Sequence, residues 1–524
     1  MEISVVIRFR NEEDHIEAVL DAVTRQDFFA NEYEIIGVNN CSSDRSAEIF
    51  SRYSSRVIKT EDYRPGKALN EAIASSQAKY ICILSAHTIP ANTTWLRTLH
   101  RHMTTPNLAG VYGAQLYPLH SRFLDKRDLD IFSTLTPRVE HHDSDYWNAN
   151  AMFPRAVWEK QAFNETVFEL EDHYWTKQLL PQGYLVHFEP EALVYHYSHI
   201  KRLDRVFLPP SDLPDEERLQ NAVVQLRQAD PNDWPTVMDA GLTLSSLCHL
   251  EPIKNAVHVI GRHLLSNPDF DVRWRMAQAL GKIDTDASVN YLVQALSDPS
   301  FYARDEASWS LARLQERAVN AVLARVPSLN IEERPFAALA LGKSGVADAE
   351  ASAVTLLLDD LDSGDTQRCI DAAYFAGEIA GVPGSDTLFA RLDALADAED
   401  ARLQMVCCWA LGRFVEATDL RDDGLLARLQ QKAQRHTDLL VRFEALVACG
   451  RWAIADRSED LLQWVAGMLN DKASRICFGA AQCLRLAAEQ QLGADLTLPH
   501  ADADFGTAYE LSLVKQAHLK KCIQ

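Results

Sequence analysis

One helical pattern recurs seven times in the second half of this 524-residue chain and limits the folds open to that half. Each copy is an apolar run with a small residue near its end, and these small residues follow one another at intervals of 30 to 38 residues. The aligned positions are Gly281, Ala312, Gly342, Gly377, Gly412, Gly450 and Cys483. Repetition at such a period predicts stacked helical pairs, because one pair alone cannot bury its apolar face. A plain helical bundle is the alternative.

The first 205 residues follow a different pattern, in which strands and helices alternate. The segments "ISVVIRF" (3–9), "YEIIGVNN" (33–40) and "YICILSA" (80–86) are typical of strands, and helical stretches separate them. Such alternation predicts a parallel sheet with helices on both faces. Ligands of such sheets bind beyond the carboxyl ends of the strands. The expected fold class is therefore an α/β domain followed by an all-α solenoid.

The length of the chain predicts two or more cores, since a single core seldom grows this large. Residues 208–237 are rich in proline and charge and are typical of a linker with one short helix. We therefore expect an α/β domain at 1–207, this linker, a solenoid at 238–490 and a C-terminal tail at 491–524.

Composition excludes several classes of protein. The chain is 47% hydrophobic and 24% charged, as soluble globular proteins are. Its net charge of −22 argues against nucleic-acid binding, because phosphate backbones require a basic surface. It has no apolar run long enough to cross a membrane and no signal peptide, so we expect a cytoplasmic protein. The ten cysteines show no regular spacing and are expected to be free thiols rather than disulfides or a zinc site.

Six short motifs lie at the strand and helix ends of the first 200 residues. They are "SVVIRFRNEE" (4–13), "IIGVNNCSSDRS" (35–46), "PGKALNEAI" (65–73), "ILSAHTIP" (83–90), "FELEDHYW" (168–175) and "VYHYSH" (194–199). In this order and at these distances they resemble the motifs of family-two inverting glycosyltransferases, which have the GT-A fold. The repeated helices of the second half resemble HEAT-like repeats of the short, PBS-lyase type. The first resemblance covers about 200 residues.

The resemblance implies a nucleotide-sugar donor at the strand ends. The residues expected to contact this donor are Arg8, Asn11, Asn39, Asp44, Lys67 and Ser85. Asp44 can also cap the helix that follows it, and Lys67 can equally be a solvated lysine at a helix start. Asn39 stands where the family usually has an aspartate, which leaves the nucleotide base undetermined.

The resemblance also implies a divalent cation that neutralises the diphosphate leaving group. Ser85-Ala86-His87 replaces the family's Asp-x-Asp, so His87 and the later His196 are the expected ligands. Imidazole suits Mn²⁺ better than Mg²⁺, so we expect Mn²⁺, with Mg²⁺ as the alternative. Alternatively, His87 only hydrogen-bonds a phosphate or a neighbouring side chain. His199 is expected to be exposed or to support the ligands.

An inverting transfer needs a base, and the resemblance assigns this role to Asp172, with Glu171 beside it. Adjacent carboxylates at a helix start also stabilise the helix dipole, which is the alternative. Burial close to Glu171 and Trp175 would raise the pKa of Asp172, as suits a base. The expected acceptor-binding residues are Trp147, Asn148, Asn150 and Trp175. Trp147 is alternatively a core residue.

These expectations describe an inverting glycosyltransferase that moves a hexosyl or related sugar to a hydroxyl of a glycan or protein. The solenoid is expected to bind the acceptor, a partner protein or a second copy in a homodimer. Because the metal motif lacks both aspartates, a catalytically degenerate scaffold for protein interactions is the competing interpretation. An enzyme requires that His87, His196 and Asp172 converge on one cleft.

Overall fold

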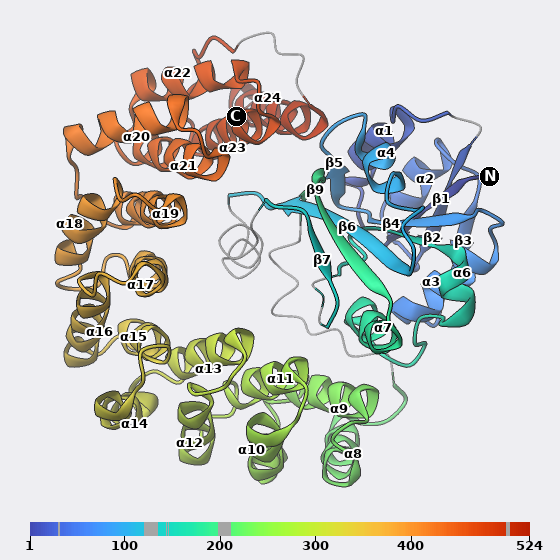
Figure 1. Cartoon of the computed structure of the whole chain (residues 1–524), viewed down its shortest axis with the longest axis horizontal. Helices are drawn as coiled ribbons and strands as arrows, with labels where there is room; N and C mark the ends of the chain where they lie inside the picture. Colours follow the sequence, from blue (N-terminus) through green and yellow to red (C-terminus); the bar gives the residue numbers. More distant parts are fainter. Residues whose placement is uncertain are drawn as a thin grey trace. The chain divides into compact units, whose positions relative to one another are not determined.

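The computed structural model divides the chain into two compact units (Figure 1). It describes residues 1–29, 32–119, 135–142, 144, 146–197, 211–498 and 504–523. The first unit comprises Met1–Arg202, Leu469–Gln491 and Leu498–Gln524, and the second comprises Leu203–Met468 and Leu492–Thr497. A mixed α/β sheet is followed along the chain by a helical region, which confirms the predicted fold class.

A nine-stranded mixed sheet forms the centre of the first unit over its described residues. The strands are β1 (Ile3–Phe9), β2 (Tyr33–Asn39), β3 (Val57–Lys59), β4 (Tyr80–Ser85), β5 (Thr88–Pro90), β6 (Leu108–Leu116), β7 (Arg138–Glu140), β8 (Asn150–Pro154) and β9 (Leu185–His196). Their order is β3-β2-β1-β4-β8-β6-β9-β5, and β7 pairs with β9. Strands β1 to β4 are parallel, as their apolar runs and the helices between them predict, whereas β8 is antiparallel to both its neighbours.

Helices of the first unit cover the sheet and complete its core. Those of the N-terminal region are α1 (Ile16–Thr24), α2 (Ser46–Ser51), α3 (Pro65–Ala74), α4 (Trp95–His100), α6 (Arg155–Lys160) and α7 (Glu171–Leu179). Helix α3 begins at Pro65, a residue whose fixed φ suits the first position of a helix. The buried ring of Trp175 in α7 lies 5.0 Å from the rings of both Phe153 and Phe163. This contact anchors α7 to the sheet.

Two helices from the far end of the chain, α23 (Ser474–Glu489) and α24 (Phe505–Ile523), also belong to the first unit. The ring of Phe478 stacks on Tyr195 of β9 with centroids 3.9 Å apart. A Cβ added to Gly506 would lie 1.9 Å from the same tyrosine ring, so only glycine fits there. The hydroxyl of Tyr197 donates to Glu510 over 2.5 Å. The C-terminal segment expected as a tail therefore contains a packed helix.

The second unit is a stack of helical pairs, as the repeats predict. Its helices are α8 (Asp215–Gln228), α9 (Trp234–Ser246), α10 (Val257–Ser266), α11 (Phe270–Leu280), α12 (Asp286–Ala295), α13 (Phe301–Arg313), α14 (Glu316–Arg325), α15 (Arg334–Gly342), α16 (Ala347–Leu361), α17 (Thr366–Glu378), α18 (Asp386–Leu395), α19 (Ala401–Ala417), α20 (Asp423–Arg435), α21 (Leu439–Ala455) and α22 (Glu459–Gly467). The odd-numbered helices from α9 to α21 contact one another in sequence, and most even-numbered helices form a second layer (Figure 1). Helix α8 and the start of α9 lie within the expected linker, residues 208–237. The domain bounds expected from the sequence stay a prediction.

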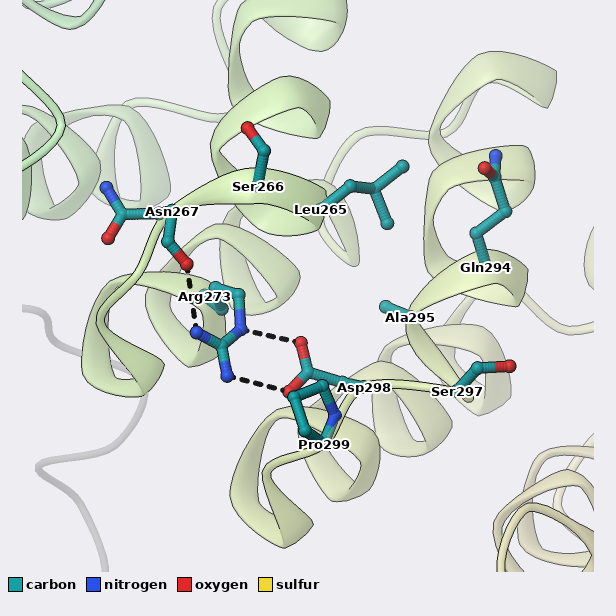
Figure 2. Close-up of a pocket in the computed structure, with 9 residues that line it drawn as sticks. All are labelled: Leu265, Ser266, Asn267, Arg273, Gln294, Ala295, Ser297, Asp298 and Pro299. Carbon is teal, nitrogen blue, oxygen red and sulfur yellow. Dashed lines mark hydrogen bonds and ion pairs between the residues drawn. The ribbon is translucent and has the colours of Figure 1, made fainter.

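Small residues and buried ion pairs join consecutive repeats. A Cβ on Gly281 would lie 2.1 Å from the hydroxyl of Ser310, so the recurrent small residue allows close approach of the helices. Figure 2 shows Arg273, which bonds Asp298 through two nitrogens at 2.7 and 3.0 Å and the carbonyl of Asn267 at 2.9 Å. A hollow of about 250 Å³ lies beside this pair. The pair fixes one repeat against the next.

Two expectations from composition can be compared with the structure. Among the described residues, no helix combines the length and the apolar character needed to cross a membrane. Every cysteine whose side chain is described is free, and most are buried, as expected of core thiols.

Candidate active site

The carboxyl ends of three parallel strands bring the predicted donor segments to one edge of the sheet. Arg8, near the end of β1, lies opposite Ser85 at the end of β4. On the other side of β1, Phe9 lies opposite Asn39, the last residue of β2. The sheet register alone therefore places these three motifs side by side.

Asp172 and Glu171 begin helix α7, and both are buried. The residue before them, Leu170, has φ 54° and ψ 33°, a left-handed conformation that is uncommon for leucine. Such a conformation costs about 1–3 kcal/mol and persists only where the surrounding structure holds it. The start of α7 is thus strained where the two carboxyl groups enter the core.

The carboxyl group of Asp172 accepts hydrogen bonds from the backbone N–H groups of Asn148 (2.8 Å) and His173 (3.0 Å). Its pKa is raised from 3.8 to about 6, because burial and then the charge of Glu171 raise it by more than His173 and the two hydrogen bonds lower it. The pKa rise expected from the sequence is present. A carboxyl group that titrates near neutral pH is suited to act as a general base.

Arg8 and Asn148 surround the carboxylate of Glu171. The guanidinium of Arg8 lies 2.8 Å from Glu171, and the Asn148 side chain donates to the same oxygen over 3.3 Å. Burial lowers the pKa of Arg8, but the charges of Tyr63, Glu171 and Asp172 raise it more, so the net pKa is raised. The amide oxygen of Asn148 is buried and has no hydrogen-bond partner among the described residues. An unpaired buried acceptor costs about 1–3 kcal/mol, which a ligand hydroxyl can offset.

The two predicted metal ligands lie together. The rings of His87 and His196 stack with centroids 5.0 Å apart and planes 19° from parallel. They come from paired segments, since Thr88 of β5 lies opposite His196 and the backbone N–H of Tyr197 donates to the carbonyl of His87. His199 lies outside the described residues.

The surroundings of both histidines suit metal ligands in one respect. A metal-bound histidine usually hydrogen-bonds an oxygen through its other ring nitrogen, which fixes the ring. Here Nδ1 of His87 lies 3.0 Å from a carboxylate oxygen of Glu12, and Nδ1 of His196 lies 2.5 Å from the side-chain oxygen of Gln115. No group of three or more histidine, cysteine or acidic side chains suited to a metal occurs in the described parts of the chain. A cation here would therefore also need ligand oxygens.

A short backbone segment connects the histidine pair to Asp172. The carbonyl of Ala149 accepts hydrogen bonds from the backbone N–H of Ser85 and the hydroxyl of Thr88, each over 3.2 Å. The preceding residue, Asn148, donates its N–H to Asp172. Adjacent residues of one loop thus contact both the strand that precedes His87 and the proposed base.

Three predicted donor residues stabilise the loop that follows β2. Asn11 accepts from the N–H of Ser43 (2.8 Å), Asn39 from Ser42 (2.9 Å) and Asp44 from Ser46 (2.9 Å). These three side chains therefore hold the backbone of the loop in place at the edge of the site. Lys67 lies in the first turn of α3, partly exposed, and pairs with the exposed Asp62 over 3.1 Å.

Two predicted acceptor residues turn out to be structural. Asn150 is fully buried, where it accepts from the Trp95 indole (2.8 Å) and donates to the carbonyls of Ala114 (3.1 Å) and Ala192 (2.7 Å). Trp175 lies in the core and donates to the carbonyl of Gln161. Both side chains are satisfied inside the domain, and acceptor binding by either of them stays a prediction.

The other two predicted acceptor residues lie at the site. Asn148 contacts both carboxyl groups, as described above. Trp147 is half-buried, with its ring 4.6 Å from that of His173, the residue after Asp172. An acceptor that reaches Asp172 would therefore pass close to this tryptophan.

The sequence interpretation missed Glu12 and Gln115, the partners of the two histidines. Glu12 belongs to the "N-E" of the first motif and is 2% exposed. Glutamate is seldom buried unless it is paired, but its burial is visible only in the fold. Gln115 is the one amide in the apolar segment "LAGVYGAQL", and this break in the pattern was an available signal.

Comparison with known proteins finds a different family model for each half of the chain. Residues 4–162 match the model of glycosyl transferase family 2, and residues 259–328 match that of HEAT repeats. The chain is 26% identical over 92 residues to the poly(ribitol-phosphate) beta-N-acetylglucosaminyltransferase TarS of Staphylococcus aureus (strain MW2). That match spans 16% of this chain and 16% of the length of the curated relative.

Two solved structures show weak overall similarity. The mannosyltransferase PcManGT from Pyrobaculum calidifontis, in complex with GDP-Man and Mn²⁺, is 15% identical with a TM-score of 0.35 over 70% of this chain and 88% of that one. Residues 1–349 of S. aureus TarS are 15% identical with a TM-score of 0.35 over 63% of this chain and 92% of that one. The family matches support a glycosyltransferase: a segment that matches glycosyl transferase family 2 is followed by HEAT repeats.

Proposed function

We propose that the chain is an inverting glycosyltransferase that moves a hexosyl or related sugar from a nucleotide-sugar donor to a hydroxyl of a glycan or protein acceptor. One observation carries the proposal: Asp172, buried at the carboxyl ends of the parallel strands, has a pKa of about 6. A single base of this kind is what inversion in one displacement requires. The match to glycosyl transferase family 2 supports the reaction class.

In the proposed step, Asp172 removes the proton of the acceptor hydroxyl while its oxygen attacks the anomeric carbon. The new C–O bond forms as the bond to the diphosphate breaks, and the electron pair leaves with the nucleoside diphosphate. Attack opposite the leaving group inverts the configuration. The unpaired oxygen of Asn148 is placed to accept a hydrogen bond from a ligand hydroxyl.

The donor is proposed to bind along the strand ends. The loop held by Asn11, Asn39 and Asp44 presents a fixed backbone there. Among the residues that the structure describes, Lys67 forms an ion pair with the exposed Asp62, and exposed pairs contribute about 0–1 kcal/mol. Lys67 can therefore exchange this partner for a phosphate at little cost.

His87 and His196 would hold a divalent cation, with Glu12 and Gln115 fixing their rings. Mn²⁺ suits imidazole better than Mg²⁺ does. When bound, the cation would stabilise negative charge on the leaving diphosphate. The protein's part is to orient the two imidazoles through Nδ1.

A catalytically degenerate scaffold is the competing function, and the replacement of Asp-x-Asp by Ser85-Ala86-His87 favours it. The buried Asp172 beside Glu171 speaks against it, because the raised pKa of Asp172 means that its ionised form destabilises the fold without serving a scaffold. The balance favours an enzyme.

The test is release of nucleoside diphosphate from a panel of nucleotide sugars with Mn²⁺. Wild type is compared with Asp172→Asn and with Asp14→Asn, a control at an exposed position of the same unit. We expect Asp172→Asn to slow release by a factor of about 10²–10⁴, the usual contribution of a general base. Donor binding, read as a rise in melting temperature, should persist in that variant. A panel in which no donor is turned over or bound would favour the scaffold.

A further inference from the structure

Helix α24 begins beside the two segments that carry the proposed metal ligands. The helix belongs to the same compact unit as the sheet. The backbone N–H of Phe505 donates to the carbonyl of Ala91 over 3.2 Å, directly after β5. The next residue, Gly506, lies against the ring of Tyr195 in β9. Strand β5 follows the first histidine of the pair and Tyr195 precedes the second, so the helix meets both segments.

Tyr197 joins α24 to the histidine pair. It directly follows His196, and its backbone N–H donates to the carbonyl of His87 over 2.8 Å. Its hydroxyl donates to the carboxylate of Glu510 in α24 over 2.5 Å. Tyr197 and Glu510 are both buried. One residue therefore contacts both histidine segments through its backbone and the C-terminal helix through its side chain.

His15 forms a second connection, which leads to the partner of His87. The ring of His15 lies 5.2 Å from that of Tyr197 and 6.0 Å from that of Tyr509 in α24. Nδ1 of His15 lies 4.0 Å from one carboxylate oxygen of Glu12, and the other oxygen of Glu12 lies 3.0 Å from His87. The hydroxyl of Tyr509 also donates to the backbone carbonyl of the residue before His15, over 2.9 Å.

The polar character of the contact with α24 distinguishes it from ordinary helix packing. Glu510 is 0% exposed, and the guanidinium of Arg485 in α23 lies 3.4 Å from its carboxylate. Taking a carboxylate out of water is costly, and removing a partner from a buried charge is strongly destabilising. A displacement of Tyr197 would leave this buried charge with fewer hydrogen bonds, so the network favours one position of the tyrosine.

Burial of apolar surface explains the docking of α24 but not this network. Helices α23 and α24 pack against each other, and Val514 of α24 is buried. Apolar contacts of this kind suffice to hold a helix in place. They do not require a carboxylate opposite the hydroxyl of the residue that follows His196. The position of Glu510 therefore needs another explanation.

We propose that α24 is a positioning element of the active site, in which Glu510 holds the two proposed metal ligands through Tyr197. His87 and His196 come from separate segments, so the distance between their rings depends on what fixes those segments. Functional side chains must be held to within about 0.5 Å of their working geometry. That the two histidines bind a cation rests on the proposed function, whereas their positioning rests on the contacts above.

The test compares three variants of the full chain with wild type. Glu510→Leu removes the acceptor of the Tyr197 hydroxyl, and Glu510→Gln keeps an acceptor oxygen at that position. Val514→Ala is the matched control, because it removes a buried apolar contact from the same helix and leaves the acceptor in place. The melting temperature of each metal-free variant measures how far the helix is loosened.

The first readout is modification of His87 by diethyl pyrocarbonate in the metal-free protein, located by mass spectrometry. The side chain of His87 is 11% exposed, so a fixed ring should react slowly. We expect Glu510→Leu to raise the rate at least about threefold, because local opening becomes more frequent. Glu510→Gln and Val514→Ala should stay within about twofold of wild type.

The second readout is Mn²⁺ affinity, measured by calorimetry. Loss of a group that directly holds a metal ligand weakens binding by about 10–100-fold. Glu510 acts through a further residue, so we expect a loss of at least about threefold in Glu510→Leu. Val514→Ala should bind Mn²⁺ as wild type does, although it melts at a lower temperature.

Three results would overturn the proposal. They are an unchanged rate of His87 modification in Glu510→Leu, wild-type Mn²⁺ affinity in that variant, and equal effects of Glu510→Leu and Val514→Ala. If Glu510→Leu does not fold, Tyr197→Phe, which removes the hydroxyl alone, replaces it in the same comparison. If wild type binds no Mn²⁺ but Glu510→Leu still speeds modification of His87, the proposed metal site is wrong and the positioning by α24 stands.

Discussion

The burial of Asp172 predicts a dependence of stability on pH that asparagine at this position removes. Its pKa rises from 3.8 to about 6 on folding, and each pKa unit corresponds to about 1.4 kcal/mol. The product is about 3 kcal/mol. The folded state holds the proton of Asp172 more tightly than the unfolded state does. Well below pH 4 the carboxyl group is protonated in both states, so it does not lower the free energy of unfolding there. Its destabilising effect grows as the pH rises from 4 to 6 and is complete above that range.

Asp172→Asn has no proton to lose at this position. We therefore expect its free energy of unfolding, relative to wild type, to increase by about 2–3 kcal/mol between pH 4 and pH 7. Replacing one carboxylate oxygen by an amide nitrogen removes an acceptor for a backbone N–H, but that cost is similar at every pH. Titrating groups that do not interact with Asp172 are shared and cancel in the difference, whereas its neighbours Glu171 and His173 contribute to the measured effect.

The assay is urea unfolding of both proteins at a series of pH values, with the difference in free energy plotted against pH. Asp14→Asn is the control for the loss of one exposed carboxylate. A difference that stays constant from pH 4 to pH 7, or that falls as the pH rises, would refute the reasoning that Asp172 is ionised in a buried site.

Three further predictions concern the site and its support. Glu171→Gln removes a charge that raises the pKa of Asp172, so the acid limb of the kcat/KM profile should move from about pH 6 to lower pH; an upward move would contradict this. His87→Ala should weaken Mn²⁺ binding measured by calorimetry, whereas the exposed His258→Ala should not, and equal affinities would remove His87 from the metal site. Gly506→Ala should destabilise the first unit by about 1–3 kcal/mol, because the added Cβ meets the ring of Tyr195. Gly467→Ala is the control, since nothing lies within 4 Å of the Cβ that it adds. Equal melting temperatures of the two variants would contradict the contact with Tyr195.

Sequence patterns predicted the architecture because local periodicity reflects burial. The alternation of strands and helices predicted the parallel strands β1 to β4. In the structure, the register of these strands places Arg8 opposite Ser85. The spacing of small residues likewise predicted the stack, since Gly281 and its equivalents lie where helices approach. These features depend on short stretches of the chain.

Side-chain direction was harder to predict. Asn148 and Asn150 are only two positions apart in the chain, yet the first contacts Asp172 and the second bonds the core carbonyls of Ala114 and Ala192. The sequence identifies a segment that approaches a ligand but not which of its side chains face the site, because that depends on the packing of distant elements. Glu12 was missed for the same reason: only the fold brings it to His87.

The docking of α24 on the first unit has a consequence for synthesis in the cell. The hydrogen bond between Tyr197 and Glu510 joins residues 313 positions apart, and that between Tyr509 and the carbonyl of Asp14 spans 495. At about 5–20 residues per second, ribosomes need on the order of tens of seconds to make the intervening segment. During that interval the aromatic surface of Tyr195 and Tyr197 has no helix to cover it. The nascent first unit therefore lacks the contacts of Tyr195 and Tyr197 with α24 until Phe505–Ile523 has been made.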